Sequence, residues 1–179
     1  MNLHTHSPIL EDILTGWRAS LGHDFTAYQN HCYRVLNFCL AFCDQSVAAM
    51  SKVSIAAAFH DLGIWANHSY DYLKPSKQLA REYLANSDRR AWTDEIEAMI
   101  EQHHKVRRYR AHPDWLVEPF RKADWTDVSR GRLTFGLPST FVADTMAAFP
   151  NAGFHKRLVA LTKQRIKTHP FSPLPMIKL

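Results

Sequence analysis

Apolar residues recur at intervals of three and four along most of this 179-residue chain, which is the spacing of amphipathic helices. No segment alternates apolar and polar residues for long enough to indicate a strand. The sequence therefore predicts an all-α fold, a helical bundle. The expected helices cover residues 8–22, 24–43, 47–62, 75–84, 93–104, 119–129, 139–148 and 154–167.

Length and composition favour one soluble globular domain. The chain is 46% hydrophobic and 22% charged, which is an ordinary globular balance. We expect a single domain over residues 1–179, with a core at about 25–130 and with C-terminal helices and a proline-rich tail at 139–179. No apolar run approaches the roughly 20 residues that span a bilayer, and no cationic segment followed by an apolar one begins the chain. We therefore expect a cytoplasmic protein without membrane contact.

The formal net charge of +5 favours partners that carry phosphate. Basic residues concentrate in one place, at residues 105–110. That cluster is either a phosphate-binding patch or a solvated loop after a helix. No helix-turn-helix or finger signature directs basic residues into a DNA groove, so nucleic acid is not an expected partner. The sequence leaves formation of a homo-oligomer open.

Residues of the types that bind metals occupy positions where helical spacing predicts apolar residues. They are His31, the adjacent pair His60 and Asp61, and Asp124. Alone, each has an ordinary explanation: a hydrogen-bonded core histidine, a helix-terminal pair, or an aspartate paired with a nearby cation. A buried carboxylate is costly unless it is paired, and four such side chains on three helices can satisfy one another around a divalent ion. The joint pattern therefore predicts a metal site. Manganese, iron, cobalt, nickel, zinc and magnesium remain candidates.

The order of these residues resembles the signature of the HD-domain superfamily of metal-dependent phosphohydrolases. Residues 57–63, which contain the pair, and residues 122–124 resemble the family's own segments, and the likeness covers about residues 25–130. The resemblance implies a helical core that binds one or two divalent cations. These would activate water to attack a phosphorylated small molecule, for which a nucleotide is a candidate.

Roles for further residues follow from the resemblance. Asp61 is the expected catalytic ligand. Arg34, one turn after His31, is expected either to hold a substrate phosphate or to form a surface salt bridge, and Lys122 is a second substrate-binding candidate. Many family members carry Lys or Glu three residues after the pair, where this chain has Ile64. Ile64 can neither hold a phosphate nor move a proton, so another group would have to do so. The candidates are Asp71 and Glu101.

Three further histidines raise the question of a second metal. They are His68, His103 and His104. Some family members use such histidines for additional ions, and a dinuclear site would share Asp61 as its bridge. The ordinary explanation is a cationic histidine at a helix C-terminus. Two other functions therefore stay open beside hydrolysis: a di-iron oxygenase, and a non-catalytic module that binds metal or nucleotide.

Overall fold

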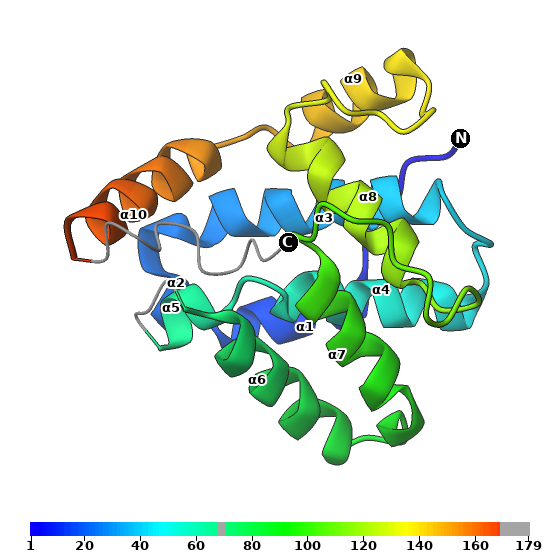
Figure 1. The fold of residues 1–179 in the computed structure, drawn as a ribbon, viewed down its shortest axis with the longest axis horizontal. Helices are drawn as coiled ribbons and strands as arrows, with labels where there is room; N and C mark the ends of the chain where they lie inside the picture. Colours follow the sequence, from blue (N-terminus) through cyan, green and yellow to red (C-terminus); the bar gives the residue numbers. More distant parts are fainter. Residues whose placement is uncertain (68–70, 169–179) are drawn as a thin grey trace.

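The structure, a computed structural model, describes residues 1–67 and 71–168, and within these ranges its regular elements are helices (Figure 1). The all-α prediction is confirmed. The α-helices are α1 (Pro8–Gly16), α2 (Arg18–Leu21), α3 (Phe25–Leu40), α4 (Val47–Phe59), α5 (Gly63–Ala66), α6 (Leu73–Ala85), α7 (Thr93–Gln102), α8 (Val117–Val128), α9 (Ser139–Ala148) and α10 (Phe154–Thr168). The last eleven residues of the expected proline-rich tail lie outside the described residues.

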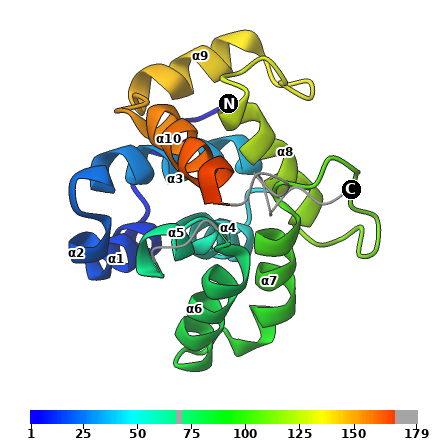
Figure 2. The same ribbon diagram turned by 60° about the vertical axis from the view of Figure 1, so that its left-hand side comes forward.

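Helix α3 is the centre of the bundle. It packs against α8 and α4, and α4 in turn packs against α1 and α7. Helices α6 and α7 form a pair below this layer in Figure 1, whereas α9 and α10 lie above it. Figure 2 shows the same arrangement after a turn of 60°, with α3 enclosed between α10 and α4. Nearly all of α3 is buried, as expected of a helix covered on all sides.

Serine caps begin two of the helices, and two predicted helices are divided. The hydroxyls of Ser7 and Ser46 accept hydrogen bonds from the first turns of α1 and α4, which satisfies otherwise unpaired amides. The predicted helix 8–22 becomes α1 and α2, and Gly22 ends α2 with a φ of 54°. The predicted helix 47–62 ends at Phe59, and a short separate helix, α5, follows the His60–Asp61 pair.

Gly63 allows α5 to lie directly against the start of α6. Its amide donates to the Ser76 hydroxyl at 3.0 Å. A Cβ at this position would lie 2.6 Å from the Tyr72 carbonyl oxygen, which is closer than packed atoms tolerate. The glycine therefore fixes Tyr72 beside the end of α4, where the His60–Asp61 pair lies.

The segment Val47–Ala66 is long and apolar enough to cross a membrane, with a mean hydropathy of 1.2. This was not expected from the sequence, because Lys52, His60 and Asp61 interrupt the apolar run. However, 78% of that stretch is buried inside the fold. It is therefore mostly a core segment of the bundle.

Candidate metal centre

The four side chains predicted to bind metal converge between α3, the end of α4, and α8. His31 Nε2 lies 2.8 Å from His60 Nε2. It also lies 3.7 Å from Asp61 Oδ2 and 3.7 Å from Asp124 Oδ1. His60 Nε2 lies 3.6 Å and 3.8 Å from the same two oxygens. All four residues are buried, so they form one compact donor cluster that bulk water does not fill.

Backbone contacts fix the orientation of two of the imidazoles. His60 Nδ1 donates to the Ala57 carbonyl at 2.8 Å, and His103 Nδ1 donates to the Ile100 carbonyl at 2.6 Å. A carbonyl only accepts, so the proton of each neutral ring sits on Nδ1 and the Nε2 lone pair faces the cluster. Metal-binding histidines are commonly held in this way.

A carboxylate performs the same task for His31. His31 Nδ1 donates to Asp127 Oδ2 at 2.6 Å, and the Phe154 ring stacks on the imidazole with centroids 4.0 Å apart. Asp127 was not predicted from the sequence. The available signal was its position one turn after Asp124, on the same inward face of α8.

Several buried atoms of the cluster have no hydrogen-bond partner among the described residues. They are Asp61 Oδ1, both carboxylate oxygens of Asp124, and His103 Nε2. A buried polar atom without a partner costs on the order of 1–3 kcal/mol, and two imidazole lone pairs facing each other repel. A divalent cation relieves both costs at once. Neutral imidazoles with carboxylates are also the donors such ions take, so these residues fit a metal.

A second donor group shares Asp61 with the first. Asp61 Oδ2 faces His31 and His60, whereas Oδ1 lies 3.4 Å from His103 Nε2 and 3.9 Å from His104 Nε2. Both sets of three, one with His31 and His60 and one with His103 and His104, are close enough to hold an ion. The position of Asp61 is therefore compatible with a bridge between two ions. His68, the third extra histidine, lies outside the described residues.

His104 differs from the other imidazoles. Its Nε2 lies 2.5 Å from the Tyr72 hydroxyl, and its Nδ1 lies 3.3 Å from Asp124 Oδ2. Its side chain is 15% exposed, against 3% or less for the other residues of the two donor groups. His104 therefore marks the side of the cluster that opens toward solvent. Tyr72, which directly precedes α6, was not predicted from the sequence.

The protonation states of His60, Asp61 and Asp124 suit metal binding. Burial lowers the pKa of His60 to about 4, so this ring is neutral at neutral pH. Burial opposes ionisation of Asp61 and Asp124, but the adjacent histidines outweigh it and hold the pKa of both carboxyls below the ordinary value. Burial also lowers the pKa of His104, yet its contact with Asp124 outweighs this and leaves the pKa raised.

Arg34 is directed away from the cluster. Its Nε and Nη2 donate to the two oxygens of Asp127, the latter at 3.0 Å, and Nη1 donates to the Phe149 carbonyl at 2.8 Å. The residue is 1% exposed. This geometry does not favour the expected contact with a substrate phosphate, nor a surface salt bridge. It makes Arg34 the buried cation that holds Asp127, and through it His31, in place.

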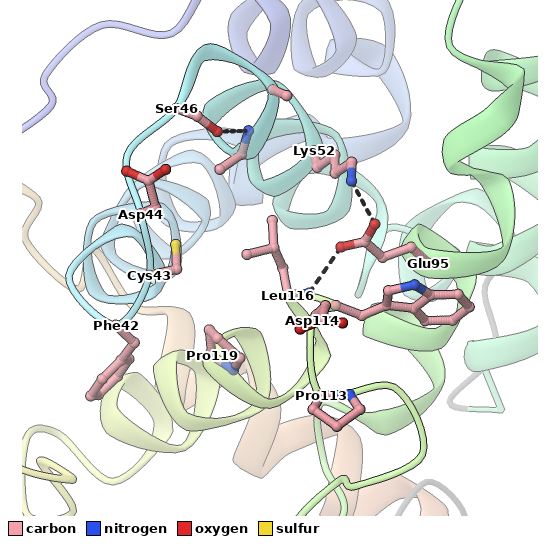
Figure 3. A pocket seen from close by; sticks show the side chains of 13 residues that line it. Phe42, Cys43, Asp44, Ser46, Lys52, Glu95, Pro113, Asp114, Leu116 and Pro119 are labelled. Atoms are coloured by element: carbon pink, nitrogen blue, oxygen red, sulfur yellow. Dashed lines mark hydrogen bonds and ion pairs between the residues drawn. The ribbon is translucent and has the colours of Figure 1, made fainter.

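The other sequence candidates lie outside both donor groups. The ammonium of Lys122 lies over the Phe42 ring, 5.3 Å from its centroid. Phe42 lines a separate hollow in which Lys52 and Glu95 pair at 2.6 Å (Figure 3). Asp71 is exposed just before α6, and Glu101 is paired with Lys77. Lys122 and Glu101 therefore have their printed contacts away from the cluster, and a role for Asp71 stays a prediction.

Comparison with known proteins agrees with the resemblance found in the sequence. The model of the HD domain matches residues 28–129, a range that contains every residue of the two donor groups. The search of curated proteins and the search of solved structures each gave no match. Because the matched range covers more than half of the chain, this chain belongs to the HD-domain superfamily, whose members are mostly metal-dependent hydrolases.

Proposed function

We propose that this chain is a metal-dependent phosphohydrolase that cleaves a phosphate ester of a small molecule. His31, His60, Asp61 and Asp124 would hold the first divalent cation, and Asp61, His103 and His104 would hold a second where one is bound. The observation that supports this most is the convergence of bare Nε2 atoms and unpartnered carboxylate oxygens at one buried point. Among the described residues, those carboxylate oxygens and His103 Nε2 have no hydrogen-bond partner.

The residues divide the chemical work. A divalent cation supplies Lewis acidity, which acidifies water and offsets charge on phosphate oxygens. Asp61 Oδ1 has no hydrogen-bond partner among the described residues, so it can accept a hydrogen bond from the attacking water and orient it. Asp127 and the Ala57 carbonyl keep His31 and His60 in the tautomer that binds metal. Burial of the cluster excludes competing water.

His104 can replace the group that Ile64 lacks. It lies on the open side of the cluster, and its pKa is raised. With one cation bound, a protonated His104 is placed to give a proton to the leaving oxygen, which is general acid catalysis. With two cations bound, His104 is instead a ligand. Counting metal ions per chain separates these two versions of the mechanism.

The proposal is tested by comparing two carboxylate-to-amide variants. Protein purified without chelator is assayed with manganese, cobalt or nickel on a panel of nucleotides and aryl phosphates. We expect Asp61→Asn to lose metal and nearly all turnover. Glu101→Gln is the matched control, because Glu101 pairs with Lys77 outside the cluster, and it should retain both. Turnover by Asp61→Asn at the wild-type rate would refute the assignment.

The shared position of Asp61 also favours a second candidate, a di-iron oxygenase. That chemistry requires two irons per chain and consumption of dioxygen with an organic substrate. Metal analysis followed by oxygen uptake measurements distinguishes it from hydrolysis. Retained metal without turnover of any phosphoester or uptake of oxygen would instead identify a binding module.

A further inference from the structure

The segment between α7 and α8 carries a concentrated positive charge. It contains Lys105, Arg107, Arg108 and Arg110, and the three arginines are exposed. Among the described residues, no carboxylate pairs with these arginines. The nearby Glu118 is already engaged by Arg121, through two bonds of 2.8 Å. The segment therefore presents three guanidinium groups that are available to an anion.

This segment is ordered by contacts with α8. The Lys105 carbonyl accepts from Arg121 Nη1 at 3.1 Å and from Trp125 Nε1 at 3.2 Å. The Tyr109 amide donates to Glu118 Oε2 at 2.9 Å. In Figure 2 the segment projects at the right-hand edge of the molecule, beside α8. Because its backbone is already fixed, a ligand would not have to order it, which lowers the cost of binding.

The cations surround a hollow of about 370 Å³. Its lining includes all four cations together with Gln102 and Tyr109. Arginine binds phosphate oxygens with paired, charge-assisted hydrogen bonds, and several guanidinium groups around one hollow suit a phosphate better than a single carboxylate. The charge that lines the hollow therefore favours a phosphate group as its ligand.

The hollow adjoins the metal centre along two elements. Lys105 directly follows His104, and Arg107 lies three residues after it, so their Cα atoms are at most about 11 Å apart. On α8, Trp125, which bonds to Lys105, directly follows Asp124. The hollow thus follows the cluster directly in the chain, and His104, on the open side of the cluster, is its nearest donor residue in sequence.

We infer that residues 105–110, the basic segment, bind a second phosphate of the substrate, away from the ester that is cleaved. The substrate class is then a small molecule with two separate phosphates, such as a nucleoside bisphosphate. This inference rests on the proposed function for the position of the scissile phosphate. The sequence left open whether the cluster is a phosphate patch or a solvated loop, and the fixed backbone with its lined hollow favours the first.

Binding is measured by calorimetry on the full chain with metal bound, because the first phosphate is placed at the metal centre, and product analysis after each titration checks that the nucleotide is intact. The probes are adenosine 3′,5′-bisphosphate and adenosine 5′-monophosphate. We expect wild type to bind the bisphosphate about tenfold more tightly, the effect of one to two charge-assisted contacts. The triple variant Arg107→Gln, Arg108→Gln, Arg110→Gln should lose this preference. A control with the same charge change, Lys156→Gln, Lys163→Gln, Lys167→Gln on α10, should keep it.

Kinetics with the metal-loaded protein add a second readout. The arginine variant should show a KM for the bisphosphate raised about tenfold and a kcat nearly unchanged, because the lost contact lies away from the reacting bond. Equal bisphosphate affinity in wild type and the arginine variant would overturn the inference. An equal loss of bisphosphate affinity in the lysine control would also overturn it. So would an arginine variant that binds a single-stranded oligonucleotide less tightly but keeps its affinity for the bisphosphate. Bisphosphate binding without hydrolysis of any phosphoester would refute the proposed function yet support the basic segment as a phosphate site.

Discussion

The hydrogen bond between His31 Nδ1 and Asp127 decides which nitrogen of His31 faces the donor cluster. Asp127 in turn is held by Arg34, which is buried with it. These contacts raise the cost of any other orientation of His31. The three residues therefore act as one unit, so a change at Arg34 should alter the orientation of His31.

Replacement of Arg34 tests this unit. Arg34→Ala leaves the buried Asp127 carboxylate without its charge partner, so the free energy of unfolding should fall by about 3–5 kcal/mol. Denaturant unfolding measures it. Arg81→Ala is the control, because Arg81 pairs with Glu97 at an exposed site, and such pairs contribute about 1 kcal/mol or less. Unchanged stability with a raised KM would instead support the substrate contact first expected for Arg34.

Titration of His60 predicts a pH dependence of stability. Its pKa is about 4 in the folded protein and about 6.5 in an unfolded chain. Between these values the unfolded state binds the proton more readily, so stability falls as the pH decreases from about 6.5 to about 4. In metal-free protein this contribution should reach about 3–4 kcal/mol, at about 1.4 kcal/mol per pKa unit.

The effect is isolated by comparison with His60→Gln, which has no group to titrate. As the pH is lowered through that window, the unfolding free energy of wild type should fall relative to that of the variant. A difference that stays constant from pH 7 to pH 4 would show that His60 is protonated equally easily in both states.

At the scale of the elements, the approach of α5 to α6 positions the open side of the cluster. Gly63 permits this approach, and Tyr72, whose carbonyl it touches, also contacts His104 through its hydroxyl. Gly63→Ala should therefore destabilise the fold by about 1–3 kcal/mol, the usual cost of overpacking. Because the backbone at Tyr72 must move, the variant should also bind less metal at the His103–His104 group.

Thermal unfolding and metal counting check this prediction. Gly16→Ala is the matched control, since a Cβ at Gly16 meets nothing within 4 Å, and it should be neutral or slightly stabilising. Equal melting temperatures for the two variants would show that α5 and α6 have room to separate.

Helix spacing in the sequence predicted most of the elements, because apolar residues recur at helical intervals in them, and serine caps begin α1 and α4. It did not predict the breaks after Gly16 and Phe59, since the periodicity continues through them. The breaks depend on how neighbouring helices pack. The same limit applied to Arg34 and Asp127: each was visibly polar on a buried face, but their pairing requires the packing of α3 on α8.

The residues of the metal centre were found from the sequence for a different reason. Each ligand is a polar residue at a position where helical spacing predicts an apolar one: His31, His60, Asp61 and Asp124. One metal ion explains all four substitutions together. Their convergence in space agrees with it. Tyr72 gave no comparable signal, because tyrosine is ordinary at the edge of a core.

For the whole molecule, a bound cation would join α3, the end of α4, and α8, with α7 added by His103 and His104. Such binding selects the folded state, because the unfolded chain does not bring these ligands together. Stabilisation follows RT ln(1 + [L]/Kd), or about 2.7 kcal/mol at a free metal concentration one hundred times the Kd. The melting temperature of wild type should therefore rise with added metal and return after chelation.

The position of a bound ion tests the metal centre most directly. A crystal of the full chain grown with zinc, measured at the zinc absorption edge, should show an anomalous peak within about 2.0–2.2 Å of His31 Nε2 and His60 Nε2 and of an oxygen from each of Asp61 and Asp124. A second peak beside His103 would identify a dinuclear site with Asp61 as the bridge. A crystal at saturating zinc with no peak among these four residues would contradict the account.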